Sequence, residues 1–514
     1  MTRRVALALS ALSLLACAKE QPFVVGSKQF TESELIGEMA AQIAEDMGIP
    51  VERKYYMGGM VCFESLKQNQ MDLYGEYTGT GLVNILGEPS QSDPEAVFRR
   101  VSSVFKEKWG LTWLSPLGFN NTYALVIKRS KADAAGLKNI SGLARAGKKF
   151  RCVFDLAFYD RPDGFPGMIR HYGGDFCSEI LQMDSGLMYQ ALADGRVDVI
   201  SGYGTDGRIK SLDLAALRDD KNFFPPYQAA YLAAPNAFNR APGLKEKLER
   251  LAGRIDDAKM TELNAAVDAE KRPAAEVARR FLSSEGLISP ADFASGAASR
   301  TFWGYFAQKK KGIYRLSLQH FAMVSGAMIL GVLFGVPLGI LLTRCKALSP
   351  YIMGITTTLQ TIPSVALLGL LMLLPVVGGI GLRPAVTALF LYSLLAIVEN
   401  TYVGISQVDG NIIDAGRGMG MTDMQILRLI ELPQALPVII AGVRISAVIC
   451  VATATIASYI GAGGLGDLIF RGVARANNAM VAWGAVPAIL MSLAIHRLLS
   501  VLERRTQARA NPQD

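Results

Sequence analysis

Five apolar segments in the second half of the chain constrain its fold more than any other feature. Each is close to the roughly 20 residues that an α-helix needs to cross the hydrocarbon of a bilayer. They lie at about 318–342, 352–374, 385–405, 438–460 and 481–502. The sequence therefore predicts an all-α transmembrane domain of about five helices within residues 301–514, embedded in a lipid bilayer.

The preceding part of the chain, residues 22–300, has the pattern of a water-soluble α/β protein. Short apolar runs such as 23–26 alternate with amphipathic stretches such as 33–47. This repetition is typical of α/β layers with parallel sheets. Glycine and proline punctuation at 115–119 and 223–226 divides this part further. We expect two lobes, one formed by about 22–120 and 226–300 and the other by about 121–225.

The N-terminus has the form of an export signal. Arg3 and Arg4 precede an apolar run at 5–16 that is too short to span a bilayer comfortably. Residues 1–21 are therefore expected to be a signal peptide. The letters Leu-Leu-Ala-Cys ending at Cys17 resemble a bacterial lipobox, which predicts lipidation of Cys17. The alternatives are an uncleaved anchor and an ordinary signal with a chance cysteine.

Export changes the interpretation of the cysteines that follow. Cys62, Cys152 and Cys177 would lie in an oxidising compartment, where one disulfide can form and one thiol is left over. The spacing leaves the pairing open. No C-x-x-C pair or His/Cys cluster is present, so we expect no metal site.

Several function classes are excluded by what the sequence lacks. The net charge of +8 is spread among acidic residues, which argues against nucleic-acid binding. No nucleophile with a base and an orienting group is evident, so we expect no catalytic residues and no enzyme. The run from Gly461 to Gly466 fits G-x-G-x-x-G but follows an apolar segment instead of a strand. A P-loop is missing, so no cofactor is expected on this chain and any ATP would be used by a partner.

Six motifs in residues 22–300 carry a family resemblance. They resemble, in the same order, the osmoprotectant-binding proteins of the glycine betaine/choline/carnitine ABC importers. The resemblance implies a two-lobed periplasmic-binding-protein fold of type II. The motifs are GSKQFTES (26–33), GEYTGTG (75–81), GFNNTYAL (118–125), DRPDGFPG (160–167), GYGTDGRI (202–209) and FFPPYQAA (223–230).

The chemistry of a quaternary ammonium agrees with these motifs. Such a group has a diffuse charge and no hydrogen-bond donor, so electron-rich ring faces are its favourable receptor. The resemblance places the cage tyrosines at Tyr77, Tyr123, Tyr203 and Tyr227. Tyr74 and Tyr189 lie in neighbouring motifs and rank lower.

A ligand carboxylate would need a cationic fork or a point charge. The family pattern offers Arg161, with Lys28 and the hydroxyl of Thr80. For Arg161 the alternative is a structural salt bridge to Asp160 or Asp163. Asn121 stands where some relatives have an acid beside the cage, so the ligand could be choline, carnitine or ergothioneine as well as glycine betaine.

The segment 414–437 resembles the cytoplasmic coupling loop of ABC importer permeases. The matching positions are Asp414, Ala415, Gly420, Leu432 and Pro433. The pattern predicts a short helix that starts at Asp414, stops before Pro433 and seats in a groove of an ABC ATPase subunit. Gly416 departs from the usual alanine and is expected to loosen the helix.

Together these patterns predict a fused substrate-binding and permease subunit of the osmoprotectant type, with a type I ABC importer transmembrane domain. It would capture a quaternary amine outside the bacterial cytoplasmic (inner) membrane and pass it inward, powered by a separate ATPase. Five crossings cannot easily enclose a path, so a permease homodimer is expected. The alternatives are import of ergothioneine by the same architecture and a membrane-anchored ligand receptor.

Overall fold

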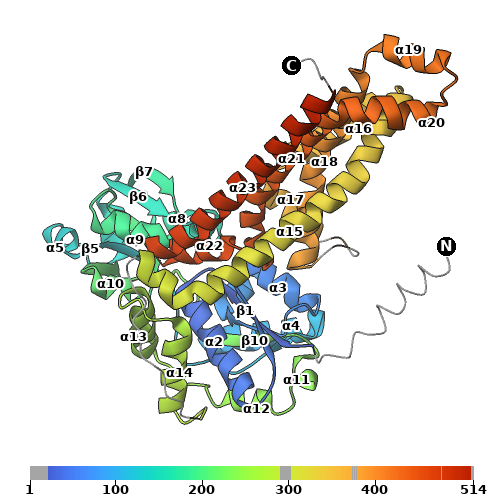
Figure 1. Ribbon diagram of the computed structural model, residues 1–514. Helices are drawn as coiled ribbons and strands as arrows, with labels where there is room; N and C mark the ends of the chain where they lie inside the picture. Colours follow the sequence, from blue (N-terminus) through green and yellow to red (C-terminus); the bar gives the residue numbers. More distant parts are fainter. Residues whose placement is uncertain are drawn as a thin grey trace.

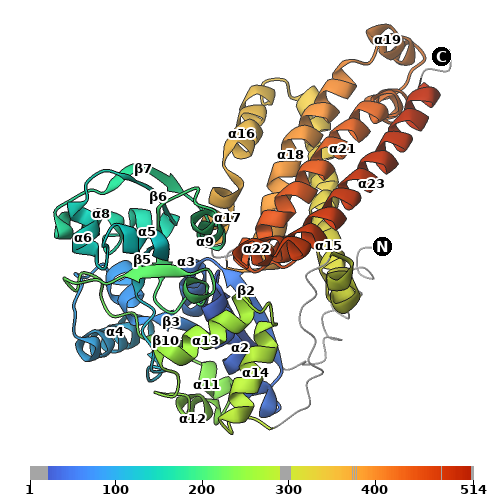
Figure 2. The same ribbon diagram turned by 90° about the vertical axis from the view of Figure 1, so that its left-hand side faces the viewer.

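The computed structural model describes residues 21–289 and 302–510, with gaps at 373, 375–376, 378 and 476. The predicted signal peptide cleavage and the lipidation of Cys17 lie outside the described residues. The described chain forms an α/β half, residues 21–289, and a helical half, residues 302–510 (Figure 1). The helical half extends from the α/β half as a bundle of long helices (Figures 1 and 2).

One five-stranded sheet forms the core of lobe 1. Its strands, in spatial order, are β2 (Val51–Met57), β1 (Phe23–Lys28), β3 (Leu73–Tyr77), β10 (Ala229–Ala233) and β4 (Thr112–Trp113). β1 runs parallel to β2 and β3, whereas β10 runs antiparallel to β3 and β4. The sheet is therefore mixed, although the strand–helix repetition indicated parallel strands. The reason is that β10 enters from the other lobe instead of through a helical crossover.

A second five-stranded sheet forms lobe 2. Its strands, in spatial order, are β7 (Cys177–Gln182), β6 (Phe150–Phe154), β8 (Val199–Tyr203), β5 (Tyr123–Lys128) and β9 (Leu214–Leu217). β6 is parallel to β7 and β8, whereas β5 is antiparallel to β8 and β9, so this sheet is also mixed. A disulfide joins Cys152 on β6 to Cys177 on β7, while Cys62 is buried as a free thiol. This settles the pairing that the sequence left open.

The chain passes between the lobes twice, between β4 and β5 and between β9 and β10. An antiparallel bridge of Asn120 with Gln228 joins the two crossings. Helices cover the sheets, and in lobe 1 α13 and α14 pack on α2. The helices are α2 (Thr31–Asp46), α3 (Gly59–Lys67), η1 (Thr80–Ile85), α4 (Pro94–Trp109), α5 (Arg129–Ala134), α6 (Ile140–Arg145), α7 (Leu156–Asp160), α8 (Phe165–Tyr172), α9 (Ser185–Ala193), α10 (Arg208–Ser211), α11 (Ala237–Arg240), α12 (Leu244–Glu249), α13 (Asp257–Asp268) and α14 (Ala274–Ser284).

In the helical half, four described helices are long and apolar enough to cross a membrane, and a fifth span exists if a bent pair is counted. The bent pair is α16 with α17, at 101° to each other. The elements are α15 (Phe302–Arg344), α16 (Ser349–Thr361), α17 (Ser364–Met372), α18 (Leu382–Ser406), α19 (Gly410–Gly418), α20 (Asp423–Ile426), η2 (Leu427–Glu431), α21 (Leu432–Ile456), η3 (Ala457–Ile460), α22 (Gly466–Ala474) and α23 (Asn478–Ala510).

This result confirms about four to five apolar helices and corrects the form of the second one. The break lies at Ile362 and Pro363, between α16 and α17. Ile362 has φ of −65° and ψ of 125°, the extended geometry that a following proline favours, so α16 ends there and α17 starts in a new direction.

Small residues let the long helices approach closely. Gly331, Gly335 and Gly339 of α15 recur every four residues and face α18. A Cβ atom at any of them would come within 3 Å of α18 side chains, from 2.3 Å at Ser393 to 2.8 Å at Ile397. Such spacing is the usual small-residue interface of membrane helices.

The two ends of the helical bundle differ in what they meet. α22 contacts α9 and η3 contacts β2 of the α/β half. The helices α19 and α20 and the end of α23 lie at the far end of the bundle (Figures 1 and 2). The segment predicted to couple to an ATPase is therefore separated from the α/β half by the length of the bundle.

Candidate functional site

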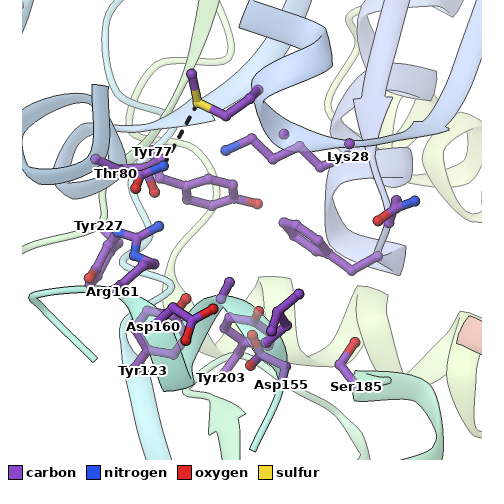
Figure 3. A pocket seen from close by; sticks show the side chains of 18 of the residues that line it. Lys28, Tyr77, Thr80, Tyr123, Asp155, Asp160, Arg161, Ser185, Tyr203 and Tyr227 are labelled. Atoms are coloured by element: carbon purple, nitrogen blue, oxygen red, sulfur yellow. Dashed lines mark hydrogen bonds between the residues drawn. The ribbon is translucent and has the colours of Figure 1, made fainter. Parts of the chain in front are cut away.

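A cavity of about 750 Å³ lies between the two lobes. All eight residues predicted for substrate binding line it. In Figure 3, Lys28, Tyr77 and Thr80 lie along one side, across from Tyr123, Asp155 and Tyr203. The eight are Lys28, Tyr77, Thr80, Asn121, Tyr123, Arg161, Tyr203 and Tyr227. The structure brings these residues together, and their part in binding stays a prediction.

The tyrosines of the cavity form a connected set of rings. The ring of Tyr123 stacks beside that of Tyr203 at 5.4 Å between centroids, and Tyr227 meets Tyr123 edge-on at 5.6 Å. Strands position two of these rings, because Tyr123 begins β5 and Tyr203 ends the neighbouring β8 directly opposite it. Burial raises the pKa of the Tyr203 and Tyr227 phenols well above the usual range, so both rings stay neutral.

Phe30 completes the set and was missed by the sequence analysis. Its ring lies 5.9 Å from that of Tyr77 in lobe 1 and 5.8 Å from that of Tyr203 in lobe 2, so it links these two rings. It also lines the cavity. The sequence signal is the motif GSKQFTES, in which Phe30 is the aromatic residue. By contrast, Tyr74 and Tyr189 are fully buried outside the lining.

The two predicted cationic residues are each paired with an acid of the protein. Lys28 Nζ donates to Glu76, and its ammonium lies 5.1 Å from the Tyr77 ring centre. Arg161 donates from Nε and Nη2 to the two carboxylate oxygens of Asp163, at 2.7 and 2.6 Å. Burial opposes the Arg161 charge, but the bond to Asp163 prevails and raises the pKa of the guanidinium. The salt-bridge alternative for Arg161 is therefore what the structure shows.

The charged side chains that line the cavity are more acidic than basic. The two cations, Lys28 and Arg161, are outnumbered by four acids: Glu76, Asp155, Asp160 and Asp184. Asp155 accepts hydrogen bonds from the Phe158 amide at 2.9 Å and the Ser201 hydroxyl at 3.2 Å. Burial raises its pKa. An acidic excess beside neutral rings favours a cation over an anion.

Glu32 ties the lobes together beneath the cavity. Its carboxylate accepts hydrogen bonds from Tyr77 and Asn121, both at 2.8 Å, from Asn264 at 3.1 Å and from Thr205 of lobe 2. Burial is the largest influence on this group and raises its pKa to about 7, although all four donors act in the opposite direction. Asn121 is thus a buried partner at the crossing between lobes, in addition to lining the cavity.

The predicted coupling segment has a different form from the one expected. α19 begins at Gly410, not at Asp414, because Asp409 caps it by accepting from the Asn411 amide at 2.9 Å. It ends at Gly418, before Gly420, whose φ is +80°. Leu432 and Pro433 do not close the segment but form the first turn of α21. Pro433 follows directly on the π-helical turn η2, within one continuous helix from Asp423 to Ile460.

Within this segment Asp414 and Ala415 lie on α19, next to Gly416, which stands where the family pattern has alanine. A Cβ at Gly416 would lie 2.9 Å from Ile430 and 3.3 Å from Met421, so the glycine permits close packing of α19 instead of only loosening it. The far end of the segment is anchored by Glu431, which is buried and accepts from Arg344 Nη1 at 3.1 Å. The segment is a packed helical unit at the end of the bundle (Figure 1).

Two stretches of the chain match known protein families. Residues 21–284 match the substrate binding domain of ABC-type glycine betaine transport systems, and residues 331–508 match the inner membrane component of binding-protein-dependent transport systems. The first of these matches covers just over half of the 514 residues.

Individual relatives match one or both of these stretches. The carnitine transport permease protein OpuCB of Listeria monocytogenes is 42% identical over 206 residues, which cover 40% of this chain and 93% of that protein. The glycine-betaine-binding protein of Pseudomonas aeruginosa is 33% identical over 308 residues, covering 58% and 99%. The ergothioneine transport permease/ergothioneine binding protein EgtU of Helicobacter pylori is 34% identical over 271 residues, covering 52% of this chain and 48% of that protein.

Proposed function

The chain belongs to the family of substrate-binding domains of ABC-type glycine betaine transport systems, here continuous with a permease domain, and we propose that it imports a quaternary ammonium compound. The observation that carries this proposal is the ring-lined cavity between the lobes, where Phe30, Tyr77, Tyr123, Tyr203 and Tyr227 meet. Each desolvated ring face can contribute roughly 0.5 to 2 kcal/mol to binding a cation.

The charges around the rings bear on which quaternary amine is bound. Lys28 and Arg161 are already paired with Glu76 and Asp163, so a ligand carboxylate would have to share cations that the protein uses itself. The excess of acids in the lining favours a ligand with a net positive charge. Choline is such a ligand, whereas glycine betaine and carnitine are zwitterions, so we propose choline ahead of the other two.

Ergothioneine is the second candidate. A relative named for both ergothioneine permease and ergothioneine binding is 34% identical over 271 residues. Ergothioneine carries a trimethylammonium group, which the same rings would recognise, together with a larger tail. The cavity of about 750 Å³ lies within the usual range for small-molecule sites and has room for either ligand.

The rest of the transport cycle follows from the ends of the bundle. The chain is a membrane protein, and we propose that its α/β half lies outside the bacterial inner membrane and that α19 and α20 lie in the cytoplasm. There Asp414, Ala415, Gly420, Leu432 and Pro433 would form or support the docking site for a separate ABC ATPase, which uses the ATP. Two copies of the chain would pair to enclose one path.

A binding experiment tests the proposed function directly. The full chain in lipid nanodiscs is titrated with choline, glycine betaine, carnitine and ergothioneine, each beside a control that lacks the methyl groups, such as ethanolamine for choline and glycine for glycine betaine. The quaternary compounds should bind more tightly, because a primary ammonium loses more hydration on entering an aromatic box. Equal affinity within the matched pairs would refute the aromatic cage.

A transport experiment tests the second half of the proposal. Proteoliposomes that contain the chain and its ATPase subunit should accumulate the tightest-binding amine only when ATP is present on the side of α19 and α20. Binding without ATP-dependent accumulation would instead favour the ligand receptor.

A further inference from the structure

The permease domain meets both lobes of the α/β half through α22. On lobe 1, Arg475 forms a buried ion pair with Glu34 of α2, and its Nε donates to the Tyr56 hydroxyl at 3.1 Å. On lobe 2, Gly186 of α9 approaches α22 so closely that a Cβ there would lie 2.4 Å from the Val473 carbonyl oxygen. α22 lies beside α9 in both ribbon views (Figures 1 and 2). The cleft therefore opens beside the permease.

A bulge in β2 shapes the lobe 1 side of this contact. The register with β1 shifts after Gly26, so that Tyr55 and Tyr56 together oppose Ser27. Tyr56 has φ of +63°, and its amide donates to the Ser27 hydroxyl at 3.1 Å. A bulge re-aims side chains at the end of a strand. Here the guanidinium group of Arg471 lies near both rings. Its central carbon is 5.9 Å from the ring centre of Tyr55 and 5.4 Å from that of Tyr56.

The bulged strand leads directly to the rim of the ligand cavity. Met57 ends β2, and Gly58 and Gly59 follow as part of the cavity lining. On the permease side, η3 brings Tyr459 to the same rim, where it is half-buried and also lines the cavity. A Cβ added to Gly58 would lie 3.0 to 3.2 Å from ring atoms of Tyr459. The Tyr459 ring thus packs against Gly58, where lobe 1 has no side chain.

We propose that Tyr459 of the permease domain is a ligand-contacting wall of the cavity in the docked chain. The inference rests on the proposed function, because it takes the cavity as the ligand site. It adds to the rings of the two lobes one ring that the α/β half does not itself carry. The ligand is consequently enclosed by both domains at the rim that faces the permease.

The chemistry of a ring at this position predicts how affinity depends on docking. A neutral tyrosine face at the rim attracts a quaternary cation and excludes water from that side. Tyr459→Ala in the full chain should therefore weaken choline binding about 3- to 10-fold, while Tyr459→Phe, which keeps the ring face, should bind like the wild type.

Docking can be removed without touching the cavity. Arg475→Ala leaves Glu34 buried without its main partner, which favours separation of α22 from lobe 1. If Tyr459 acts only when docked, Arg475→Ala should show the same loss of affinity as Tyr459→Ala. The double variant should then lose no more than either single variant, the signature of coupled positions.

The experiment measures equilibrium binding of radiolabelled choline, and of radiolabelled glycine betaine, to the full chain in lipid nanodiscs. Tyr402→Ala on α18 is the matched control, since Tyr402 is also half-buried in the permease domain but does not line the cavity, and its affinity should stay at the wild-type value. Gly58→Ala changes the lobe 1 side of the same contact, because the added methyl group would push against the Tyr459 ring. It should weaken binding in the wild type and have no further effect beside Tyr459→Ala.

The outcomes separate this inference from the proposed function. Wild-type affinity in both Tyr459→Ala and Gly58→Ala overturns the role of Tyr459 and leaves the quaternary-amine site intact. Equal losses in Tyr459→Phe and Tyr459→Ala also overturn it, because the ring would then not be the contact. Failure of the wild-type chain to bind choline and glycine betaine here, and carnitine and ergothioneine in the titration that tests the proposed function, overturns the proposed function and this inference together.

Discussion

Truncation of Tyr203 tests the ring-lined cavity most sharply, because this side chain stands between two others. Its ring lies 5.4 Å from that of Tyr123 and 5.8 Å from that of Phe30, and it lines the cavity. Tyr203→Phe preserves all of these ring positions, whereas Tyr203→Ala removes one wall. We therefore expect the two variants to differ strongly in affinity for choline.

The magnitude follows from the contacts that each change removes. Loss of one desolvated cation–π contact corresponds to roughly 0.5 to 2 kcal/mol, or about a 2- to 30-fold weaker affinity for Tyr203→Ala. Loss of two aromatic pairs should also lower the free energy of unfolding by about 1 to 3 kcal/mol, in addition to the lost burial. Tyr203→Phe should change affinity about twofold or less, because the ring face remains.

Calorimetric titration of the full chain in nanodiscs with choline measures affinity, and thermal unfolding of the same samples measures stability. Tyr172→Ala is the matched control, since Tyr172 is a buried tyrosine of lobe 2 that does not line the cavity. It should lose stability and keep its affinity. The reasoning would be refuted if the Phe and Ala variants of Tyr203 bound alike, or if Tyr172→Ala lost as much affinity as Tyr203→Ala.

Three further changes test other parts of the structure. Arg161→Lys keeps the charge but loses the planar fork, so affinity for glycine betaine and carnitine, measured by calorimetry, should fall more than affinity for choline. Equal losses for all three would mean that Arg161 binds only Asp163 of the protein and not the ligand. Burial raises the pKa of Glu32 to about 7, so the folded chain binds this proton more tightly than the unfolded chain. The free energy of unfolding should consequently fall by about 3 kcal/mol between about pH 4.5 and 7 in the wild type but not in Glu32→Gln. Chemical denaturation at several pH values measures it, and the same pH dependence in both proteins would contradict this prediction. Gly420→Pro should abolish uptake and leave ligand affinity unchanged, because proline cannot adopt φ of +80°. The control Gly418→Ala meets open space and should transport normally, and uptake that survives in a stable Gly420→Pro protein would exclude a coupling role for this turn.

Much of the site could be anticipated because it depends on residue identities inside short motifs. The rings of Tyr77, Tyr123, Tyr203 and Tyr227 meet at one cavity as the motifs implied. The ion-pair partners of the charged residues could not be predicted in the same way. Arg161 lies two residues from Asp163 in the same motif, and whether it pairs there or stays free for a ligand depends on how the turn between them folds.

The two-part organisation and the membrane segments were determined by the sequence alone, because apolar length and motif composition are properties of single segments. Tertiary structure decided the rest. Two strands that lie side by side paired Cys152 with Cys177, and one predicted span bent at Pro363 although Pro337, Pro437 and Pro487 lie inside continuous helices. Tyr459 reaches the cavity rim at Gly58, about 400 residues away in sequence, only because the two domains pack together. Such long-range contacts arise from packing that no local pattern encodes, since the free energy that creates them is shared across the whole interface.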